Sequence, residues 1–451
     1  MIFSNDENLY FSSLLLLSIS MKNIVFLQKD NNYVVYNIER HVSVLVDYVG
    51  YLLIQLFLQS KEDIDDFGNY LPESIKQNAF DFINRLKKIG LFYNGICKEI
   101  NIVNNIPNQY YLHLTYKCNL KCKYCYNKDI RNYFSELSMN KWEKIISSIS
   151  PFAKNVIITG GEPFLFKNID RVVDMLKSAN MSVIIEIISN GMIEFSSYKF
   201  NRLFDRIDKI TFSCDSFVDS NQLRVGFKVD NLFHNIQWLK VKNNKLKIAI
   251  SSTYFKNGFL NQKIIENYCK NNNIDFRSVL IVPNNICELK YLPTINEYKN
   301  AILNKSKDIT MKRVHCGAAV GLFSIAPNGD VFPCQNLHYD EFKIGNILNS
   351  SLNDLINSSM AIYFREKLKV YNIKKCKSCS MRFICGGGCR AATYRLEHDI
   401  SEHPKHLCKF YKEESINDLY NYNRFDLETI MENSDKINNI LINQLKNIKI
   451  K

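Results

Sequence analysis

Three cysteines within eight residues form the most chemically distinctive segment of the sequence. Cys118, Cys122 and Cys125 have the spacing C-x3-C-x2-C and follow an apolar, strand-like run over residues 110–116. Thiolate sulfur is the usual protein ligand of iron–sulfur clusters, which commonly take four thiolates. This loop supplies three, so one iron would be open to a ligand that is not protein. A structural zinc site is the alternative, although such sites usually combine two C-x2-C units.

A second set of seven cysteines lies between His315 and the C-terminal tail. It consists of Cys316, Cys334, the group Cys376, Cys379, Cys385 and Cys389 with the spacing C-x2-C-x5-C-x3-C, and Cys408. Spacing alone would allow zinc or iron–sulfur clusters here. The chain has 14 cysteines but only 16 glycines and 9 prolines in 451 residues. Clustered thiols in so long a chain indicate reduced metal ligands, and therefore a cytoplasmic protein, in preference to disulfides.

The overall composition is that of a globular protein of about two to four domains. Hydrophobic residues make up 46% and charged residues 23%, and the formal charge of +13 is spread over scattered lysines. We interpret this charge as a solvated surface, with a groove for an acidic peptide second and nucleic acid third. The apolar run over 9–19 lacks a basic start and a cleavage site and is too short to span a membrane. We expect residues 1–20 to be dispensable.

Residues 22–93 are predicted to form a small winged-helix-like domain, followed by a linker over 94–108. The pattern indicates a hairpin of strands over 22–28 and 33–38, helices over 44–58 and 73–89, and a closing strand over 91–93. A DNA-reading winged helix is the functional rival, but the mixed charge of the later helix does not favour it.

Residues 109–300 alternate between strand and helix patterns, which predicts an α/β domain with a parallel sheet. Strands are expected over 110–116, 156–159, 183–188, 210–214, 246–253 and 276–282, and helices over 141–150, 169–179, 231–241 and 262–271. Six strands suffice for an open partial barrel, a (β/α)6 arrangement. Ligands gather at the carboxyl ends of such strands. The residues after the strands that could contact a ligand are Gly160, Gly161, Glu162, Ser189, Asn190, Ser213, Asp215 and Arg224.

The first cysteine loop resembles the signature of radical SAM enzymes, C-x3-C-x-aromatic-C, with Tyr124 at the aromatic position. The resemblance implies a [4Fe–4S] cluster whose open iron binds S-adenosylmethionine and a 5′-deoxyadenosyl radical that abstracts hydrogen. It further implies that Gly160, Gly161 and Glu162 bind the methionine amino group, that Ser189 and Asn190 hold the ribose, and that Arg224, beyond Ser213 and Asp215, holds the carboxylate. We expect Cys214 to be a buried free thiol.

The seven later cysteines resemble the SPASM extension of peptide-modifying radical SAM enzymes, predicted here over 301–410 before a helical tail over 411–451. The resemblance implies two auxiliary iron–sulfur clusters. Cys376, Cys379, Cys385 and Cys408 would hold the outer one, and Cys316, Cys334 and Cys389 the inner one. The inner cluster is then one thiolate short: Cys287 or another distant residue completes it, or one iron is open to a substrate thiolate. Gln335 stands where sulfatase-maturing relatives have an aspartate base, which argues against formylglycine formation.

The N-terminal domain resembles the element that binds leader peptides in the maturation of ribosomally made peptides. Together these resemblances predict a peptide maturase that joins a cysteine sulfur to a carbon of a precursor peptide. The expected partners are that precursor, which would pair with an open strand edge, and a flavodoxin or ferredoxin as electron donor. Carbon–carbon cross-linking or another oxidative edit is the runner-up. A non-catalytic electron-transfer or DNA-binding iron–sulfur protein is the alternative from another class.

Overall fold

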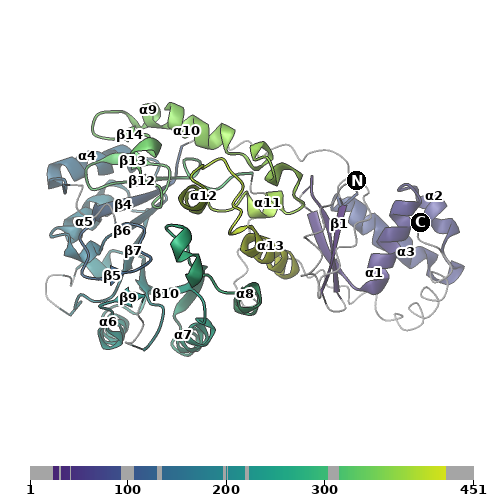
Figure 1. The fold of residues 1–451 in the computed structure, drawn as a ribbon, viewed down its shortest axis with the longest axis horizontal. Helices are drawn as coiled ribbons and strands as arrows, with labels where there is room; N and C mark the ends of the chain where they lie inside the picture. Colours follow the sequence, from purple (N-terminus) through teal and green to yellow (C-terminus); the bar gives the residue numbers. More distant parts are fainter. Residues whose placement is uncertain are drawn as a thin grey trace.

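The structure is a computed structural model in which a small N-terminal unit and a large sheet with its helices lie at opposite ends (Figure 1). It describes residues 24–29, 32–40, 42–92, 106–128, 135–196, 200, 202–218, 223–302 and 314–422. The predicted dispensable segment 1–20 and most of the predicted linker lie outside these residues. In the described part of the chain, no helix is both long and apolar enough to cross a membrane.

The N-terminal unit is a three-stranded antiparallel sheet followed by three helices. The strands are β1 (Ile24–Lys29), β2 (Asn32–Asn37) and β3 (Val42–Val46), and the helices are α1 (Tyr48–Gln59), α2 (Ile64–Asn69) and α3 (Glu73–Lys88). Two predicted details are wrong. Residues 44–46 belong to a third strand and not to a helix, because valine fits a pleated strand and Asp47 caps the helix only afterwards. Leu91 and Phe92 form a turn and not a closing strand.

Both faces of this small sheet are covered. Side chains alternate along β2, so Val34 and Val35 face opposite sides. Val35 packs on the helices of the unit. Val34 and Tyr36 pack against Met381 and Ile384 in the C-terminal cysteine-rich segment. The N-terminal unit is thus joined to that segment by a buried apolar contact.

Six parallel strands form the main sheet, in the order β11-β10-β8-β7-β6-β4. They are β4 (Gln109–Thr115), β6 (Asn155–Gly160), β7 (Ile184–Ser189), β8 (Lys209–Ser213), β10 (Lys247–Tyr254) and β11 (Asp275–Leu280). The crossover helices are α4 (Met139–Ile149), α5 (Ile169–Ala179), α6 (Val229–Lys242) and α7 (Phe259–Asn271). All six predicted strands and all four predicted helices are confirmed.

The apolar core lies between this sheet and its helices. Tyr110, Leu112 and Leu114 alternate along β4 and are fully buried, and they share one cluster with Trp142 of α4. Burying such side chains stabilises the fold by roughly 1.5–3 kcal/mol each. Because the six strands are parallel, their carboxyl ends lie at one edge, and the segments that follow them meet there.

The main sheet continues into the cysteine-rich segment, which sequence analysis did not predict. β12 (Leu322–Ile325) pairs in parallel with β4, and β13 (Asp330–Phe332) and β14 (Gly345–Asn346) follow as antiparallel strands. A separate two-stranded ribbon joins β5 (Lys121–Cys122) to β9 (Arg224–Val225). The cysteine-rich segment is therefore anchored directly on the first barrel strand.

The remaining helices belong to the second half of the chain. They are α8 (Ile295–Ile302), α9 (Leu352–Ile356), α10 (Ser359–Ile362), α11 (Arg382–Cys385), α12 (Arg390–Glu397) and α13 (Cys408–Tyr422). α13 runs across the predicted domain end at residue 410, and its Leu419 is buried against the N-terminal sheet. The predicted tail helix over 425–445 lies outside the described residues.

Candidate functional site

The ribbon of β5 and β9 holds the first cysteine loop in place. Cys122 is paired with Arg224 in this ribbon, and the Lys123 N–H donates to the Leu223 carbonyl at 2.8 Å. Cys118 and Cys125 act on the pKa of Cys122, so the three thiols lie close together. Burial raises the pKa of Cys122 to about 11, although Arg224 opposes this. Metal binding would therefore have to displace a proton from this thiol.

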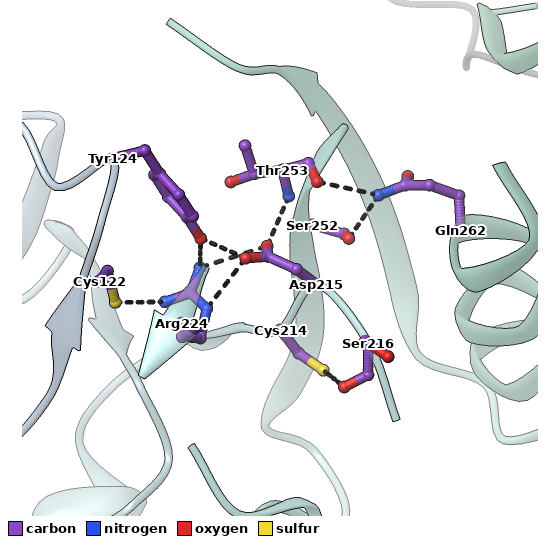
Figure 2. Close-up of polar contacts among 9 residues, drawn as sticks. All are labelled: Cys122, Tyr124, Cys214, Asp215, Ser216, Arg224, Ser252, Thr253 and Gln262. Atoms are coloured by element: carbon purple, nitrogen blue, oxygen red, sulfur yellow. Dashed lines mark hydrogen bonds and ion pairs between the residues drawn. The ribbon is translucent and has the colours of Figure 1, made fainter. Parts of the chain in front are cut away.

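Arg224 is the centre of a buried polar network beside this loop (Figure 2). Its Nε and Nη2 donate to the two carboxylate oxygens of Asp215 at 3.2 and 3.3 Å, and Nη2 also lies 2.6 Å from the Tyr124 hydroxyl. Its Nη1 points at the Cys122 sulfur at 3.9 Å. The Tyr124 hydroxyl donates to Asp215, and the Thr253 N–H donates to the same carboxylate at 2.8 Å.

This network brings together three residues that the sequence singled out. Burial raises the pKa of Tyr124 well above its usual range although Arg224 opposes it, so the hydroxyl stays protonated and can donate. All three guanidinium nitrogens of Arg224 contact other side chains of the protein, two of which, Cys122 and Tyr124, belong to the first cysteine loop. Arg224 therefore holds this loop in position. Its predicted contact with a cofactor carboxylate stays a prediction. Ser213 ends β8 two residues before Asp215 and is half-buried, and Cys214 is a fully buried free thiol, as expected.

The two glycines after β6 allow the chain to pass very close to the start of the cysteine loop. The Gly161 N–H donates to the Thr115 carbonyl and the Glu162 N–H to the Lys117 carbonyl, both at 2.8 Å. A Cβ on Gly161 would lie 2.1 Å from the Lys117 carbonyl oxygen, and one on Gly160, where φ is +124°, would lie 2.4 Å from that of Thr115. Only glycine fits at these positions. In this structure the two glycines let the backbone of residues 115–117 pack directly against the segment after β6.

Glu162 is fully buried and organises the loop after β7. Its carboxylate accepts from the Ser189 hydroxyl at 2.9 Å and from the N–H groups of Asn190 and Phe164 at 2.8 and 3.2 Å. Burial raises the pKa of Glu162 to about 7, although these three hydrogen bonds act in the opposite direction. The carboxylate therefore faces the protein, and any contact of this segment with a ligand ammonium stays a prediction.

Asn190 connects that loop to the first cysteine loop. Its Nδ2 donates to the Asn119 side-chain oxygen at 2.7 Å and lies 3.8 Å from the Cys118 sulfur. Sequence reasoning missed Asn119, because a single asparagine between two cysteines carries no distinctive pattern. The predicted residues after β6, β7 and β8 thus all converge on one cysteine loop.

The later cysteines fall into two groups. Cys316 and Cys389 act on the pKa of the Cys334 thiol, which burial raises above its usual range. Cys376, Cys379 and Cys408 act likewise on Cys385, whose pKa burial raises to about 12. These are the inner set of three and the outer set of four that the resemblance implies. Cys287 is exposed and lies in a 3-10 helix over Ile286–Tyr291, outside both groups.

The chemistry of these thiol groups fits iron–sulfur clusters, for which thiolate sulfur is the usual protein ligand. Among the described residues, no three or more His, Cys, Asp or Glu side chains are arranged to hold one metal ion. The thiolates of a cubane bind different irons and stand further apart than the four ligands of zinc. The donor sets of three, three and four thiols fit iron–sulfur clusters, and each set of three is one thiol short among the described residues.

Comparison with known proteins agrees with this chemistry. Residues 112–251 match the radical SAM superfamily, and residues 316–380 match the SPASM iron–sulfur cluster-binding domain. The chain is therefore an enzyme that contains a radical SAM domain followed by a SPASM domain. These two domains imply [4Fe–4S] clusters and S-adenosylmethionine as cofactors.

Individual relatives cover most of the chain at low identity. The subtilosin biosynthesis protein AlbA of Bacillus subtilis is 23% identical over 380 residues, covering 77% of this chain and 82% of AlbA. The structure of anSMEcpe with bound AdoMet aligns with a TM-score of 0.57 at 17% identity, over 75% of this chain and all of that one. Streptococcus suis SuiB bound to its precursor peptide SuiA aligns with a TM-score of 0.53 at 17% identity, over 85% and 97% of the two chains.

Proposed function

We propose that this enzyme installs a thioether between a cysteine sulfur and a carbon of another residue in a ribosomally made precursor peptide. The observation that carries the proposal is the division of ten cysteines into sets of three, three and four. The inner auxiliary set of Cys316, Cys334 and Cys389 is one thiol short among the described residues. A substrate thiolate is the missing ligand, which places the sulfur that reacts beside the barrel.

The barrel residues have separate tasks in this reaction. When bound, the core cluster and S-adenosylmethionine supply a radical that takes one hydrogen atom from the substrate carbon. Cys118, Cys122 and Cys125 hold the cluster, and the segment Gly160–Glu162 lies beside them to hold the methionine end. Ser189 and Asn190 follow the next strand and bind the ribose. Tyr124, Asp215 and Arg224 keep the loop rigid and exclude water.

The bond is balanced by loss of two hydrogens from the peptide. The carbon loses a hydrogen atom, the thiol loses its proton, and sulfur–carbon bond formation releases one electron. Auxiliary clusters held by the two later cysteine sets would accept that electron. An external carrier such as a flavodoxin or ferredoxin would supply the reducing equivalent that starts the cycle. Both the carrier and the cytoplasmic location belong to the proposal.

The N-terminal unit is the place where the leader of the precursor binds. Its three-stranded sheet has β1 and β3 at its edges, and an open edge can receive an extended peptide through main-chain hydrogen bonds. The same sheet packs on Met381 and Ile384, close to the outer cysteine set. SuiB, whose structure holds the precursor SuiA, offers a precedent for a precursor bound to this fold.

The alternatives differ in which atoms the peptide loses and keeps. A carbon–carbon cross-link would remove two hydrogens and leave the cysteines free. Formylglycine formation is disfavoured because Gln335 cannot serve as a base near neutral pH. A non-catalytic electron carrier or DNA-binding protein would make no 5′-deoxyadenosine above background.

The test uses the anaerobically reconstituted full-length enzyme, S-adenosylmethionine, a reductant and the small cysteine-containing peptide encoded beside it. We expect 5′-deoxyadenosine, a loss of two hydrogens per bond, and thiols that no longer react with an alkylating agent. A peptide with serine in place of cysteine is the control and should stay unmodified. An unchanged peptide mass would defeat the proposal, and lost hydrogens with thiols still alkylatable would favour the carbon–carbon alternative.

A further inference from the structure

Arg390 is a buried cation that has no acidic partner among the residues described by the structure. It begins α12 directly after Cys389 and is 1% exposed. Its Nη1 donates to the carbonyls of Ile400 and Glu402 at 3.1 and 2.8 Å, and its Nη2 donates to the Gly387 carbonyl. Its buried Nε has no hydrogen-bond partner in the described part of the chain. The Glu402 carboxylate pairs instead with Lys405 at 3.3 Å.

Such a charge is costly unless an opposite charge lies near it. Removing an ion from water costs several kcal/mol after relaxation, and neutral carbonyls offset only part of that. Among the described residues no carboxylate forms an ion pair with Arg390. An anionic group bound by the neighbouring cysteines would supply such a counter-charge.

Arg390 lies next to both auxiliary cysteine sets. It directly follows Cys389 of the inner set, and its Nη2 donates to the carbonyl of Gly387, two residues after Cys385 of the outer set. Burial raises the pKa of Cys376, in the outer set, to about 11, and Arg390 is the foremost charge that opposes this. Burial also raises the pKa of Cys316, in the inner set, where both the charge and the backbone N–H of Arg390 oppose the shift. One guanidinium thus acts on a ligand of each cluster.

Tyr411 fills the space beside this cation. Its hydroxyl contacts the backbone of Cys389, and its ring packs so closely on Gly388 that a Cβ there would lie 2.4 Å from the tyrosine Cε2. Cys385 of the outer set and Cys389 of the inner set both act on Tyr411. Arg390 is therefore buried in a closely packed region next to both sets, where a charge is weakly screened.

We propose that Arg390 is the shared counter-charge of the two auxiliary clusters and raises the reduction potential of both. An electron added to either cluster places negative charge near a fixed positive charge, which favours the reduced form. Both clusters then accept the electron that bond formation releases more readily. The inference rests on the presence of two auxiliary clusters and does not depend on which bond the enzyme makes.

The test is an EPR-monitored redox titration of the full-length reconstituted protein. Replacing Cys118, Cys122 and Cys125 by alanine removes the core signal, so that only the auxiliary clusters are observed. Arg390→Met should lower the reduction potential of both auxiliary clusters by about 59 mV each. For a one-electron reduction, this shift corresponds to a tenfold change in the equilibrium constant. Arg390→Lys keeps the charge and should shift them less.

Two other buried arginines are controls. Arg395 acts on Cys334 of the inner set, so Arg395→Met should move the inner cluster alone. Arg365 is also buried, and its charged neighbour is Glu366, so Arg365→Met should leave both potentials in place.

Each outcome decides the proposal. Lowered potentials for both clusters in Arg390→Met, largely restored in Arg390→Lys, support it. Unchanged potentials, or a shift of one cluster only, overturn it. If Arg390→Met loses auxiliary iron, restored iron in Arg390→Lys supports a role for the charge. If the lysine variant loses iron as well, the guanidinium acts only as a clamp for carbonyls and the proposal fails.

Discussion

The buried pair of Asp215 and Arg224 should be strongly coupled in energy. The Asp215 side chain is fully buried and that of Arg224 is 9% exposed. Asp215→Asn keeps an acceptor for Thr253 but turns an amide donor toward the guanidinium and the Tyr124 hydroxyl. Breaking a buried pair from one side typically costs about 3–5 kcal/mol, because the remaining charge is left without compensation. We expect a destabilisation of the barrel in that range.

A double-mutant cycle measures this coupling. Asp215→Asn, Arg224→Met and the double variant are compared by urea unfolding of the full-length chain under reducing, anaerobic conditions. The fluorescence of Trp142 and Trp238, the only two tryptophans, reports on barrel helices α4 and α6. The double variant should be more stable than the sum of the single effects predicts, by about 2–3 kcal/mol.

An exposed pair provides the matched control. Asp174 and Arg206 form an ion pair whose side chains are 47% and 42% exposed. Such pairs are worth about 0–1 kcal/mol, so Asp174→Asn should change the unfolding midpoint very little. Additive effects at Asp215 and Arg224, within about 0.5 kcal/mol, would refute the claim that this pair braces the cysteine loop.

Two further predictions concern the segment after β6. The pKa of Glu162 is raised from 4.5 to about 7, so its stabilising contribution is fully present below about pH 4.5 and is lost as the pH rises through 7. The loss of stability is on the order of 3 kcal/mol. The difference in unfolding free energy between wild type and Glu162→Gln should therefore change with pH across this window. A difference that stays constant with pH would contradict the raised pKa of the buried Glu162 carboxyl. Gly161→Ala would force a Cβ against the Lys117 carbonyl oxygen. Iron counting and EPR should then show less iron at the first cysteine loop and unchanged iron at the later cysteine sets. Full iron loading of the first loop would contradict the close approach of Gly161 to Lys117.

The main sheet was predictable because its strands are short apolar runs that alternate with amphipathic helices. The strands at 110–116 and 156–159 lie where the pattern placed them, and the residues that follow them converge because parallel strands end together. The proximity of the cysteines within each set was predictable from spacing and resemblance, and their role as cluster ligands stays a prediction.

Other features could not be predicted because they depend on distant partners. β5 and β9 are two residues long, too short to show any period, yet they pair Cys122 with Arg224. β12 pairs with β4, which lies about two hundred residues earlier in the sequence. No local sequence pattern predicts a pairing between such distant strands. Val44, Leu45 and Val46 form an apolar run that fits a helix or a strand equally well. The inward-facing carboxylate of Glu162 depends on its neighbours after β7.

Iron counting and EPR with and without the three core cysteines test the central claim most directly. The anaerobically reconstituted wild-type protein should bind about twelve irons, four for each of three clusters, and the reduced core signal should change when S-adenosylmethionine is added. Replacement of Cys118, Cys122 and Cys125 by alanine should leave about eight irons and remove the response to S-adenosylmethionine. Zinc in place of iron at that loop, or a response that survives the triple replacement, would contradict the account.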